Sequence, residues 1–289
     1  MEKYKPLIDD WESFEKQSEN YPLQGLRRNC LKAQNDFEDE LSEKFDFEES
    51  SWNSNVYRVS SEVPGKSMLH WRGEYYVQEE SASLPVTIMD PRPGERVLDM
   101  CAAPGGKATQ MAARMGNEGL VVANDESSQR MKSLHANVYR TGSSIVSASN
   151  YDGRNIPEDE KFDRVLVDAP CSGEGDRYYR NFEPANKEES VGLSRLQQDL
   201  MEKAEKLVKD DGVIVYSTCT ITPVENENVV SKVLEETDLE LEKIETGAEH
   251  VRGVKEFEDN TYGGEMSKTV RVYPHHLDSG VIYVAKFRK

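Results

Sequence analysis

Hydrophobic positions from about residue 80 to the C-terminus alternate between two spacings. Short apolar runs rich in β-branched residues predict strands at 96–100, 119–125, 144–150, 162–168, 212–218 and 281–287. Segments with apolar residues at helical spacing separate these runs, and the longest covers about 193–209. Gly142 marks the end of one predicted helix, and Pro223 stands at the entry of another. Repeated strand–helix units predict an α/β protein with a parallel, doubly wound sheet that binds ligands at the carboxyl ends of its strands.

Residues 1–77 lack this repeat and form a separate predicted unit. Its predicted elements are two helices and one strand, at 4–17, 35–45 and 54–61. We therefore expect a small N-terminal α+β domain over 1–77 and a larger α/β domain over 78–289, with the boundary inside 72–82.

The charge of the chain is strongly negative. It carries 54 Asp and Glu against 36 Lys and Arg, a formal net charge of −18. Taken alone, this balance argues against a nucleic-acid partner, because neutralisation of phosphates normally supplies the affinity. At about 1 M salt, however, the Debye length falls to about 3 Å, and a negative surface no longer repels RNA at a distance. We therefore hypothesise a salt-rich cytoplasm, with an ordinary acidic soluble enzyme as the alternative.

Cysteine spacing and hydropathy predict a cytoplasmic protein. No apolar run approaches the roughly 18–20 residues of a membrane helix. The N-terminus is charged from its second residue, so we expect no signal peptide. The four cysteines are far apart and include no CxxC pair. This spacing argues against structural zinc and against a disulfide framework, and we expect reduced thiols and no metal.

Acidic residues follow three successive predicted strands and indicate a nucleoside cofactor. Asp99 ends the first strand and leads into MCAAPGGK, a Gly-rich turn that lets backbone N–H groups approach a carboxylate-bearing ligand. Asp125 ends the second strand, where a carboxylate accepts hydrogen bonds from ribose hydroxyls. Asp152 follows the third strand, where it suits an adenine amino group. The set favours S-adenosylmethionine, although the Gly-rich turn alone is also consistent with a purely structural turn.

Two cysteines follow the next two strands and suggest covalent catalysis. Cys171 lies in VDAPCSG and Cys219 in YSTCT, so both are expected at the sheet edge that holds the methyl donor. Carbon 5 of a pyrimidine becomes nucleophilic when a thiolate adds to carbon 6, and the carbon 5 proton must later leave. Lys107 is a cation that favours a thiolate, and Asp168 suits hydrogen bonding to the base edge. This reasoning leaves open which thiol attacks.

The other cysteines and a histidine pair receive simpler interpretations. Cys30 is expected to be an inert thiol buried in the core, the common state of cytosolic cysteine. Cys101 is expected to form a wall of the cofactor pocket. Adjacent histidines rarely share one face, so His275 and His276 are expected to be a loop pair at the rim of the active site rather than metal ligands.

Together these motifs resemble those of the Sun/NOP/RsmB family of RNA cytosine-5 methyltransferases. The similarity runs from about residue 76 to the C-terminus and weakly into LRRNCLKA. It implies a class I, Rossmann-like methyltransferase fold with a seven-stranded sheet whose last strand is antiparallel. It also implies that Cys219 is the nucleophile and that Cys171 assists release of the methylated base. The implied donor pocket consists of Cys101, Ala102, Ala103, Pro104, Gly105, Gly106, Lys107, Asp125, Arg130, Asp152 and Asp168.

The resemblance leads us to expect an S-adenosylmethionine-dependent RNA cytosine-5 methyltransferase. We expect tRNA as substrate, with rRNA as the alternative, and we expect a monomer. A second alternative is a non-catalytic RNA-binding or ribosome-assembly factor on a methyltransferase scaffold. Arg27, Arg28 and Lys32 form a local positive cluster in the N-terminal domain and are candidate RNA contacts. Replacement Arg28→Glu is expected to weaken RNA binding without changing donor affinity.

Overall fold

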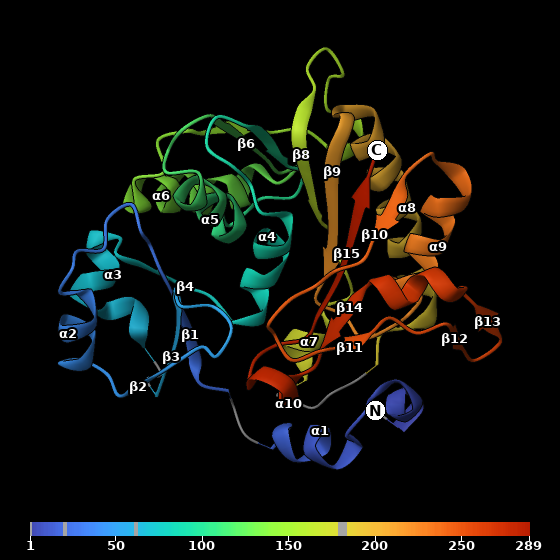
Figure 1. Ribbon diagram of the computed structural model, residues 1–289, viewed down its shortest axis with the longest axis horizontal. Helices are drawn as coiled ribbons and strands as arrows, with labels where there is room; N and C mark the ends of the chain where they lie inside the picture. Colours follow the sequence, from blue (N-terminus) through green and yellow to red (C-terminus); the bar gives the residue numbers. More distant parts are fainter. Residues whose placement is uncertain (1, 20–21, 61–62, 179–183) are drawn as a thin grey trace.

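The computed structural model describes residues 2–19, 22–60, 63–178 and 184–289 (Figure 1). Its α-helices are α1 (Trp11–Gln17), α2 (Phe37–Ser42), α3 (Met68–Arg72), α4 (Leu84–Met89), α5 (Gly106–Arg114), α6 (Ser128–Thr141), α7 (Glu174–Arg177), α8 (Lys187–Leu207), α9 (Glu227–Glu236) and α10 (Pro274–Leu277). Its 3₁₀ turns are η1 (Glu2–Leu7), η2 (Pro64–Lys66), η3 (Ser81–Ser83), η4 (Gly153–Asn155) and η5 (Gly264–Lys268). Its strands are β1 (Gln24–Arg28), β2 (Phe47–Glu49), β3 (Val56–Val59), β4 (Tyr75–Val77), β5 (Arg96–Asp99), β6 (Leu120–Asn124), β7 (Val146–Ser149), β8 (Phe162–Asp168), β9 (Val208–Thr218), β10 (Glu240–Glu242), β11 (Val251–Arg252), β12 (Glu256–Phe257), β13 (Asn260–Thr261), β14 (Val270–Val272) and β15 (Ile282–Arg288).

A small antiparallel sheet forms most of the N-terminal part. Its strand order is β2-β3-β1-β4. Leu26 of β1 and Tyr57 of β3 stand opposite each other and pack with Phe37 of α2 and Tyr75 of β4. Period-2 alternation places these side chains on one face of the sheet, where the short helices cover them.

The first helices of the chain pack on the larger domain and not on this small sheet. Tyr4 of η1 and Phe14 of α1 are buried against Tyr178, Ile221 and Tyr273. Figure 1 shows α1 beside α10, away from β1–β4. Aromatic rings carry this contact, with the centroids of Phe14 and Tyr178 4.7 Å apart. The division of the chain at residue 77 into two domains stays a prediction, because its first elements support the second unit.

The large sheet has the α/β architecture that the sequence predicts. In the described part of the chain it has nine strands: eight follow the order β11-β14-β15-β9-β8-β5-β6-β7, and β10 pairs with β15. Strands β5 to β9 are mutually parallel, and β15 is antiparallel to β9. The expected seven strands correspond to the path from β14 to β7, and the short strands β10 and β11 extend it. Chain order reverses between β5 and β8, the place where such sheets bind ligands.

Two helix starts differ from the sequence prediction. Helix α8 begins at Lys187, before the apolar periodicity becomes visible at 193. The Asn186 side chain accepts a hydrogen bond from the Glu188 N–H, and this cap adds a polar first turn that hydrophobic spacing does not reveal. Helix α9 begins at Glu227, four residues after Pro223, because backbone hydrogen bonds from Asn226 and Asn228 to the Pro223 carbonyl hold the intervening residues in a turn.

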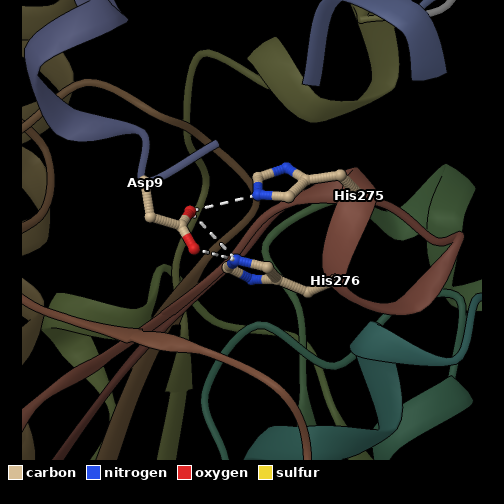
Figure 2. A group of neighbouring side chains, drawn as sticks. All are labelled: Asp9, His275 and His276. Carbon is tan, nitrogen blue, oxygen red and sulfur yellow. Dashed lines mark hydrogen bonds and ion pairs between the residues drawn. The ribbon is translucent and has the colours of Figure 1, made fainter. Parts of the chain in front are cut away.

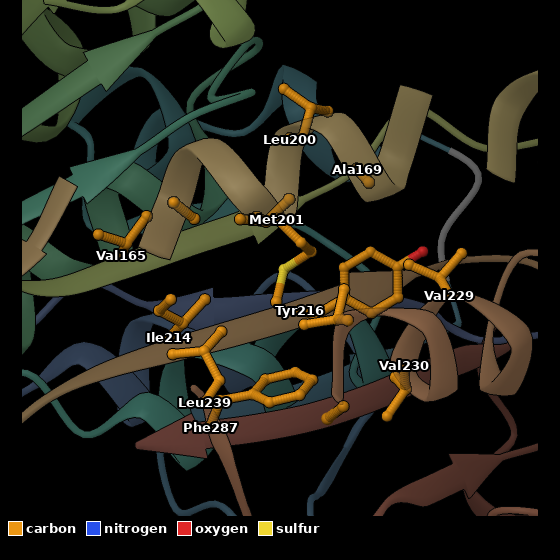
Figure 3. Close-up of a cluster of buried hydrophobic side chains, with 14 of the residues drawn as sticks. Val165, Ala169, Leu200, Met201, Ile214, Tyr216, Val229, Val230, Leu239 and Phe287 are labelled. Carbon is orange, nitrogen blue, oxygen red and sulfur yellow. The ribbon is translucent and has the colours of Figure 1, made fainter. Parts of the chain in front are cut away.

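Helices cover both faces of the large sheet. Val165 and Val167 of β8 point toward α8 and α9, and Leu166 points toward α4 and α5. Figure 3 shows the hydrophobic cluster on the face covered by α8 and α9, where Met201 and Tyr216 pack between the sheet and these helices. Among the residues that the structure describes, no helix joins the length and the apolar character needed to cross a membrane.

Candidate active site

The carboxyl ends of β8 and β9 bring the two predicted thiols together. These strands are parallel neighbours, with Asp168 opposite Ser217. The turns that follow them place the Sγ atoms of Cys171 and Cys219 3.3 Å apart. Both cysteines are half-buried. The two thiols therefore face the same small volume at the sheet edge.

An ion pair joins the other two predicted catalytic residues. Lys107 Nζ lies 2.7 Å from Asp168 Oδ2, and Ser217 Oγ donates to Asp168 Oδ1 at 2.7 Å. Burial lowers the pKa of Lys107, but the Asp168 charge and hydrogen bond outweigh it and the net pKa is raised, with smaller contributions from Asp99 and Cys219. Lys107 therefore stays positively charged beside the thiols.

Two cavities meet at Cys101. A cavity of about 250 Å³ is lined by Tyr76, Val77, Gln78, Ala82, Asp99, Cys101, Ala102, Ala103, Pro104, Gly106, Lys107 and Asp168. A second cavity of about 30 Å³ is lined by Met100, Cys101, Asp125, Glu126, Arg130, Asp152, Gly153, Pro170, Leu196 and Leu200. Burial, followed by the charges of Asp99 and Asp168, raises the pKa of Cys101 well above its ordinary value, so its thiol is neutral. Cys101 thus has the place and the chemistry of a pocket wall.

The Gly-rich loop is fixed by hydrogen bonds to the end of β6. Asp125 accepts from the N–H groups of Ala103 at 3.1 Å and Ser127 at 3.0 Å. Arg130 pairs with Asp125 at 3.3 Å and donates to the Ala103 carbonyl. Gly105 has φ of +104°, and a Cβ there would lie 2.8 Å from Leu134 Cδ1, so glycine is required behind the loop.

Asp152 is already engaged by a neighbour. Arg154 donates to its carboxylate from the backbone N–H, Nε and Nη2, the last at 2.6 Å. Asp152 lines the smaller cavity, but these bonds compete for the lone pairs that an adenine amino group would use. Its predicted role in adenine binding stays a prediction.

Asp99 is a buried acid that the sequence analysis counted among the acids of the cofactor site without assigning it a ligand group. Its side chain is fully buried on the wall of the larger cavity, and neither carboxylate oxygen has a hydrogen-bond partner among the described residues. Burial, followed by the negative charge of Asp168, raises its pKa to about 8. An unpaired acid at a cavity wall suits a cationic ligand group. Its place at the end of a strand before the Gly-rich turn was the available signal.

Three buried glutamates that the sequence reasoning missed hold the cysteine turns. Glu174 Oε2 accepts from Thr220 Oγ1 at 2.8 Å and from the next two N–H groups at 3.0 Å each. Glu225 Oε2 accepts from the Ser172 N–H at 2.9 Å. Glu227 pairs with Arg271, whose Nη1 donates to the Ile221 carbonyl at 2.8 Å. The letters SGEG and VENEN within the cysteine motifs were the available signal.

Two expectations about residues near the end of β1, Cys30 and Arg27, are wrong. Cys30 is exposed and not buried, because it follows the end of β1, where its Sγ contacts Asn55 Oδ1 at 3.2 Å. Arg27 is only 5% exposed, so it is not a surface contact for RNA. Its guanidinium donates to Gly106 O at 2.6 Å and to Thr109 Oγ1 at 2.9 Å, which ties β1 to the helix after the cofactor loop.

The histidine pair holds the N-terminal segment and does not line either donor-side cavity. His275 and His276 lie on α10, and both Nε2 atoms are 3.1 Å from Asp9 Oδ1 (Figure 2), so these adjacent side chains do share one face. The three side chains have the spacing of a candidate metal site. However, His276 Nδ1 accepts a bond from the Tyr273 N–H, so the neutral ring carries its proton on Nε2 and donates it to Asp9. That nitrogen is then not a metal ligand.

Known proteins share this sequence and architecture. Family models match residues 86–288, as 16S rRNA methyltransferase RsmB/F, and residues 1–80, as the N-terminal domain of 16S rRNA methyltransferase RsmF. The tRNA (cytosine(49)-C(5))-methyltransferase of Pyrococcus abyssi is 39% identical over all of this chain and 95% of its own length. The 25S rRNA (cytosine-C(5))-methyltransferase nop2 of Schizosaccharomyces pombe is 40% identical over 79% of this chain and 39% of its own length. A methyltransferase homologue of Pyrococcus horikoshii has a similar structure, with a TM-score of 0.84 and 30% identity over 96% of this chain and 90% of that one. The chain, with its paired thiols and its class I sheet, belongs to the RsmB/F family of methyltransferases.

Proposed function

We propose that this protein transfers a methyl group from S-adenosylmethionine to carbon 5 of cytosine in RNA. The observation that carries the proposal is the pair of thiols, Cys171 and Cys219, with their Sγ atoms 3.3 Å apart beside the cofactor loop. Carbon 5 of cytosine is a poor nucleophile until a thiolate adds to carbon 6. An amine nitrogen is nucleophilic already and has no use for a thiol, so the thiol pair favours the carbon target.

Cys219 is the proposed nucleophile. Its thiolate forms the Sγ–carbon 6 bond, and the electron pair of the carbon 5–carbon 6 double bond moves onto the ring and makes carbon 5 nucleophilic. The Lys107 ammonium favours the thiolate electrostatically. Asp168, held by Lys107 and Ser217, is assigned to hydrogen bonding at the base edge, which supports the charge that develops on the ring.

Cys171 is assigned to product release. After methylation, carbon 5 still carries its proton, and the base remains attached to Cys219. Cys171 in its thiolate form takes the carbon 5 proton, that electron pair re-forms the double bond, and Cys219 leaves as a thiolate. The 3.3 Å separation of the two Sγ atoms supports this assignment, because the step needs a proton acceptor next to the bond that breaks.

The residues of the two cavities fit the methyl donor. S-adenosylmethionine supplies the electrophilic methyl group and carries an ammonium, a ribose and an adenine. Neither buried oxygen of Asp99 has a hydrogen-bond partner in the part of the chain that the structure describes, which suits the ammonium, and Asp125 lines the smaller cavity, where it suits the ribose hydroxyls. The remaining proposed donor contacts are Cys101, Ala102, Ala103, Pro104, Gly105, Gly106, Lys107, Arg130, Asp152 and Asp168.

We propose tRNA as the substrate class and rRNA as the second candidate. The relative named a tRNA methyltransferase is matched over 95% of its length. The relative named a 25S rRNA methyltransferase is matched over only 39% of its length, so most of that protein lies outside the similarity. We also propose that the protein acts as a cytoplasmic monomer without a metal ion.

Trapping of the covalent intermediate tests the proposal. Wild type, Cys171→Ala, Cys219→Ala and Cys30→Ala are incubated with S-adenosylmethionine and unmodified tRNA, or with rRNA transcripts, at high potassium chloride. Products are separated on denaturing gels and analysed for 5-methylcytidine. Cys30 is the control for the loss of a thiol, because it is exposed and lines neither donor-side cavity; it lines a separate cavity beside β1, so this variant is compared at saturating RNA.

The expected result assigns each thiol separately. Cys171→Ala accumulates an RNA-linked band, Cys219→Ala gives neither band nor 5-methylcytidine, and Cys30→Ala behaves like wild type. If 5-methylcytidine forms in rRNA and not in tRNA, rRNA replaces tRNA as the proposed substrate. Absence of 5-methylcytidine from wild type with both RNAs, and no trapped band in any variant, would overturn the proposal in favour of a non-catalytic scaffold.

A further inference from the structure

A third cavity lies away from the thiols, on the seam between the small sheet and the large one. It has a volume of about 370 Å³ and is walled by the end of β1, the turn before β3, the segment that follows α4 and the last turn of α5. Four of its lining residues are arginines, at positions 27, 28, 92 and 114, and Asp90 is its acid.

This cavity reverses the charge balance of the molecule. The chain has 54 acidic against 36 basic residues, but apart from the buried Arg27 the seam cavity has three basic residues, Arg28, Arg92 and Arg114, against one acidic residue. The smaller donor-side cavity shows the opposite balance, with Asp125, Glu126 and Asp152 against Arg130. An acidic protein that binds a polyanion needs such a local positive site, because its overall field is repulsive.

Hydrogen-bond donors remain available in the cavity. Arg92 is 66% exposed and Arg114 is 36% exposed, and both pair with the single carboxylate of Asp90. One carboxylate neutralises one of these two charges, and each guanidinium has five N–H donors. Arg28 Nη2 donates to the Gln34 carbonyl at 3.2 Å and Nη1 lies 3.9 Å from Glu38, while the side chain is 27% exposed.

Helix α5 connects the seam cavity to the active site. Lys107 in its first turn lines the catalytic cavity, and Arg114 in its last turn lines the seam cavity. At a rise of about 1.5 Å per residue, these positions are about 10 Å apart along the helix axis. Arg27, bonded to Gly106 and Gln78, forms the wall between the two cavities.

We propose that the arginine-lined seam cavity binds phosphodiester groups of the RNA substrate, outside the pocket that receives the target base. Guanidinium forks match phosphate oxygens in pairs, and an open cavity on the seam admits a strand that also reaches the thiols. This site adds Arg92 and Arg114 to Arg28 as candidate RNA contacts. The inference rests on the proposed function for the identity of the polyanion.

The test compares RNA affinity and its salt dependence in charge-neutralised variants. Arg92→Gln and the pair Arg92→Gln/Arg114→Gln are measured against wild type by filter binding of tRNA across about 0.1 to 1 M potassium chloride. Lys232→Gln is the control, because Lys232 is an exposed cation on α9, paired with one carboxylate and remote from the seam. Thermal melting and S-adenosylmethionine affinity verify that each variant is folded.

We expect the variants to lose affinity for RNA but not for S-adenosylmethionine. The double variant raises the RNA Kd about tenfold at low salt and reduces the slope of log affinity against log salt by about 1.4 to 1.8, the loss of two phosphate contacts. Arg92→Gln gives about half that change in slope, and Lys232→Gln none. Donor affinity and kcat at saturating RNA stay at the wild-type level, while KM for RNA rises.

Different outcomes separate this inference from the proposed function. If wild type methylates RNA while the double variant keeps its RNA Kd and salt slope, the seam site is wrong and the proposed function stands. If wild type gives no 5-methylcytidine but its RNA binding depends on Arg92 and Arg114, the seam site stands and the proposed function fails. Thermal stabilisation by inorganic phosphate or AMP that requires these arginines, without any change in RNA affinity, would make the cavity a site for free anions and overturn the RNA assignment.

Discussion

Glu174 is predicted to be a positioning residue for both thiols. Its carboxylate is fully buried on α7, three residues after Cys171. It accepts five hydrogen bonds: from Tyr4 Oη at 2.6 Å, Ala185 N at 2.8 Å, Thr220 Oγ1 at 2.8 Å, and the N–H groups of Ile221 and Thr222 at 3.0 Å each. Three of these donors belong to the turn directly after Cys219. One side chain therefore joins both cysteine turns to the N-terminal segment.

The replacement Glu174→Gln has a cost that follows from this donor set. If the new amide NH₂ faced the Thr220–Thr222 turn, two backbone N–H groups would lose their acceptor. In the less costly orientation the amide NH₂ faces Tyr4, and the Tyr4 hydroxyl rotates to accept a hydrogen bond from it. The Ala185 N–H then loses its acceptor. An unpaired buried N–H costs about 1–3 kcal/mol, and the other bonds lose their charge assistance. Relief of carboxylate desolvation offsets part of this loss, so we expect a destabilisation of about 2–4 kcal/mol.

Tyr4→Phe is the gentler companion variant. It removes one of five donors and leaves the carboxylate with four, for which we expect a loss of about 1–2 kcal/mol. Burial, followed by the Glu174 charge, raises the pKa of Tyr4 far above its ordinary value, so its hydroxyl remains a donor at every working pH. Tyr4 lines neither donor-side cavity, so its effect on the thiols reaches them through its bond to Glu174 and its packing against Ile221.

Urea unfolding and intermediate trapping together check this reasoning. Glu235→Gln, an exposed acid on α9, is the control for the loss of a carboxylate. In a Cys171→Ala background, Glu174→Gln and Tyr4→Phe should slow formation of the RNA-linked adduct, at unchanged S-adenosylmethionine affinity. A free energy of unfolding within about 0.5 kcal/mol of wild type for Glu174→Gln, with an unchanged adduct rate, would refute the positioning role.

Two further predictions concern buried charges near the cofactor loop. Burial raises the pKa of Asp99 to about 8, against about 3.9 in an unfolded chain, so the native state holds an extra proton between these values. The contribution of Asp99 to the free energy of unfolding should therefore fall as pH rises from about 4 to 8, so between pH 6 and pH 9 wild type should lose more stability than Asp99→Asn in urea titrations; equal losses would contradict it. Arg27→Lys should weaken S-adenosylmethionine binding about three- to tenfold by calorimetry, because one ammonium cannot hold Gly106 and the helix after it as a guanidinium fork does. If the variant binds S-adenosylmethionine as tightly as wild type, the Arg27 bonds are not needed to hold the Gly-rich loop.

Local patterns in the sequence account for the sheet and for the contents of its binding edge. The predicted strand at 162–168 is β8 to the residue, and acids or cysteines at the strand ends meet because parallel neighbours share one edge. Strands β10, β11 and β14 were not predicted, since two or three residues carry too little periodicity. Their pairing is fixed by neighbouring strands, which no local window contains.

Long-range contacts account for what the sequence could not reveal about the site. Arg27 was interpreted as part of a positive surface cluster, but β1 packs against α5, and burial of its guanidinium depends on that docking. Helix α1 was assigned to the small domain by proximity in the chain, whereas its aromatic residues complete the core beside α10. Residue type alone does not distinguish a solvated arginine from a buried one that satisfies carbonyl groups.

The placement of the thiols therefore depends on the two ends of the chain. The bond from Tyr4 to Glu174 spans 170 positions, and Tyr273 Oη donates to the Leu7 carbonyl at 3.1 Å. Asp9 adds hydrogen bonds with the histidines of α10. Strand pairing fixes where β8 and β9 end, but the turns beyond them are held by buried glutamates, one of which, Glu174, accepts a hydrogen bond from Tyr4 of the N-terminal segment. The geometry of Cys171 and Cys219 is thus a property of the docked whole and not of their motifs alone.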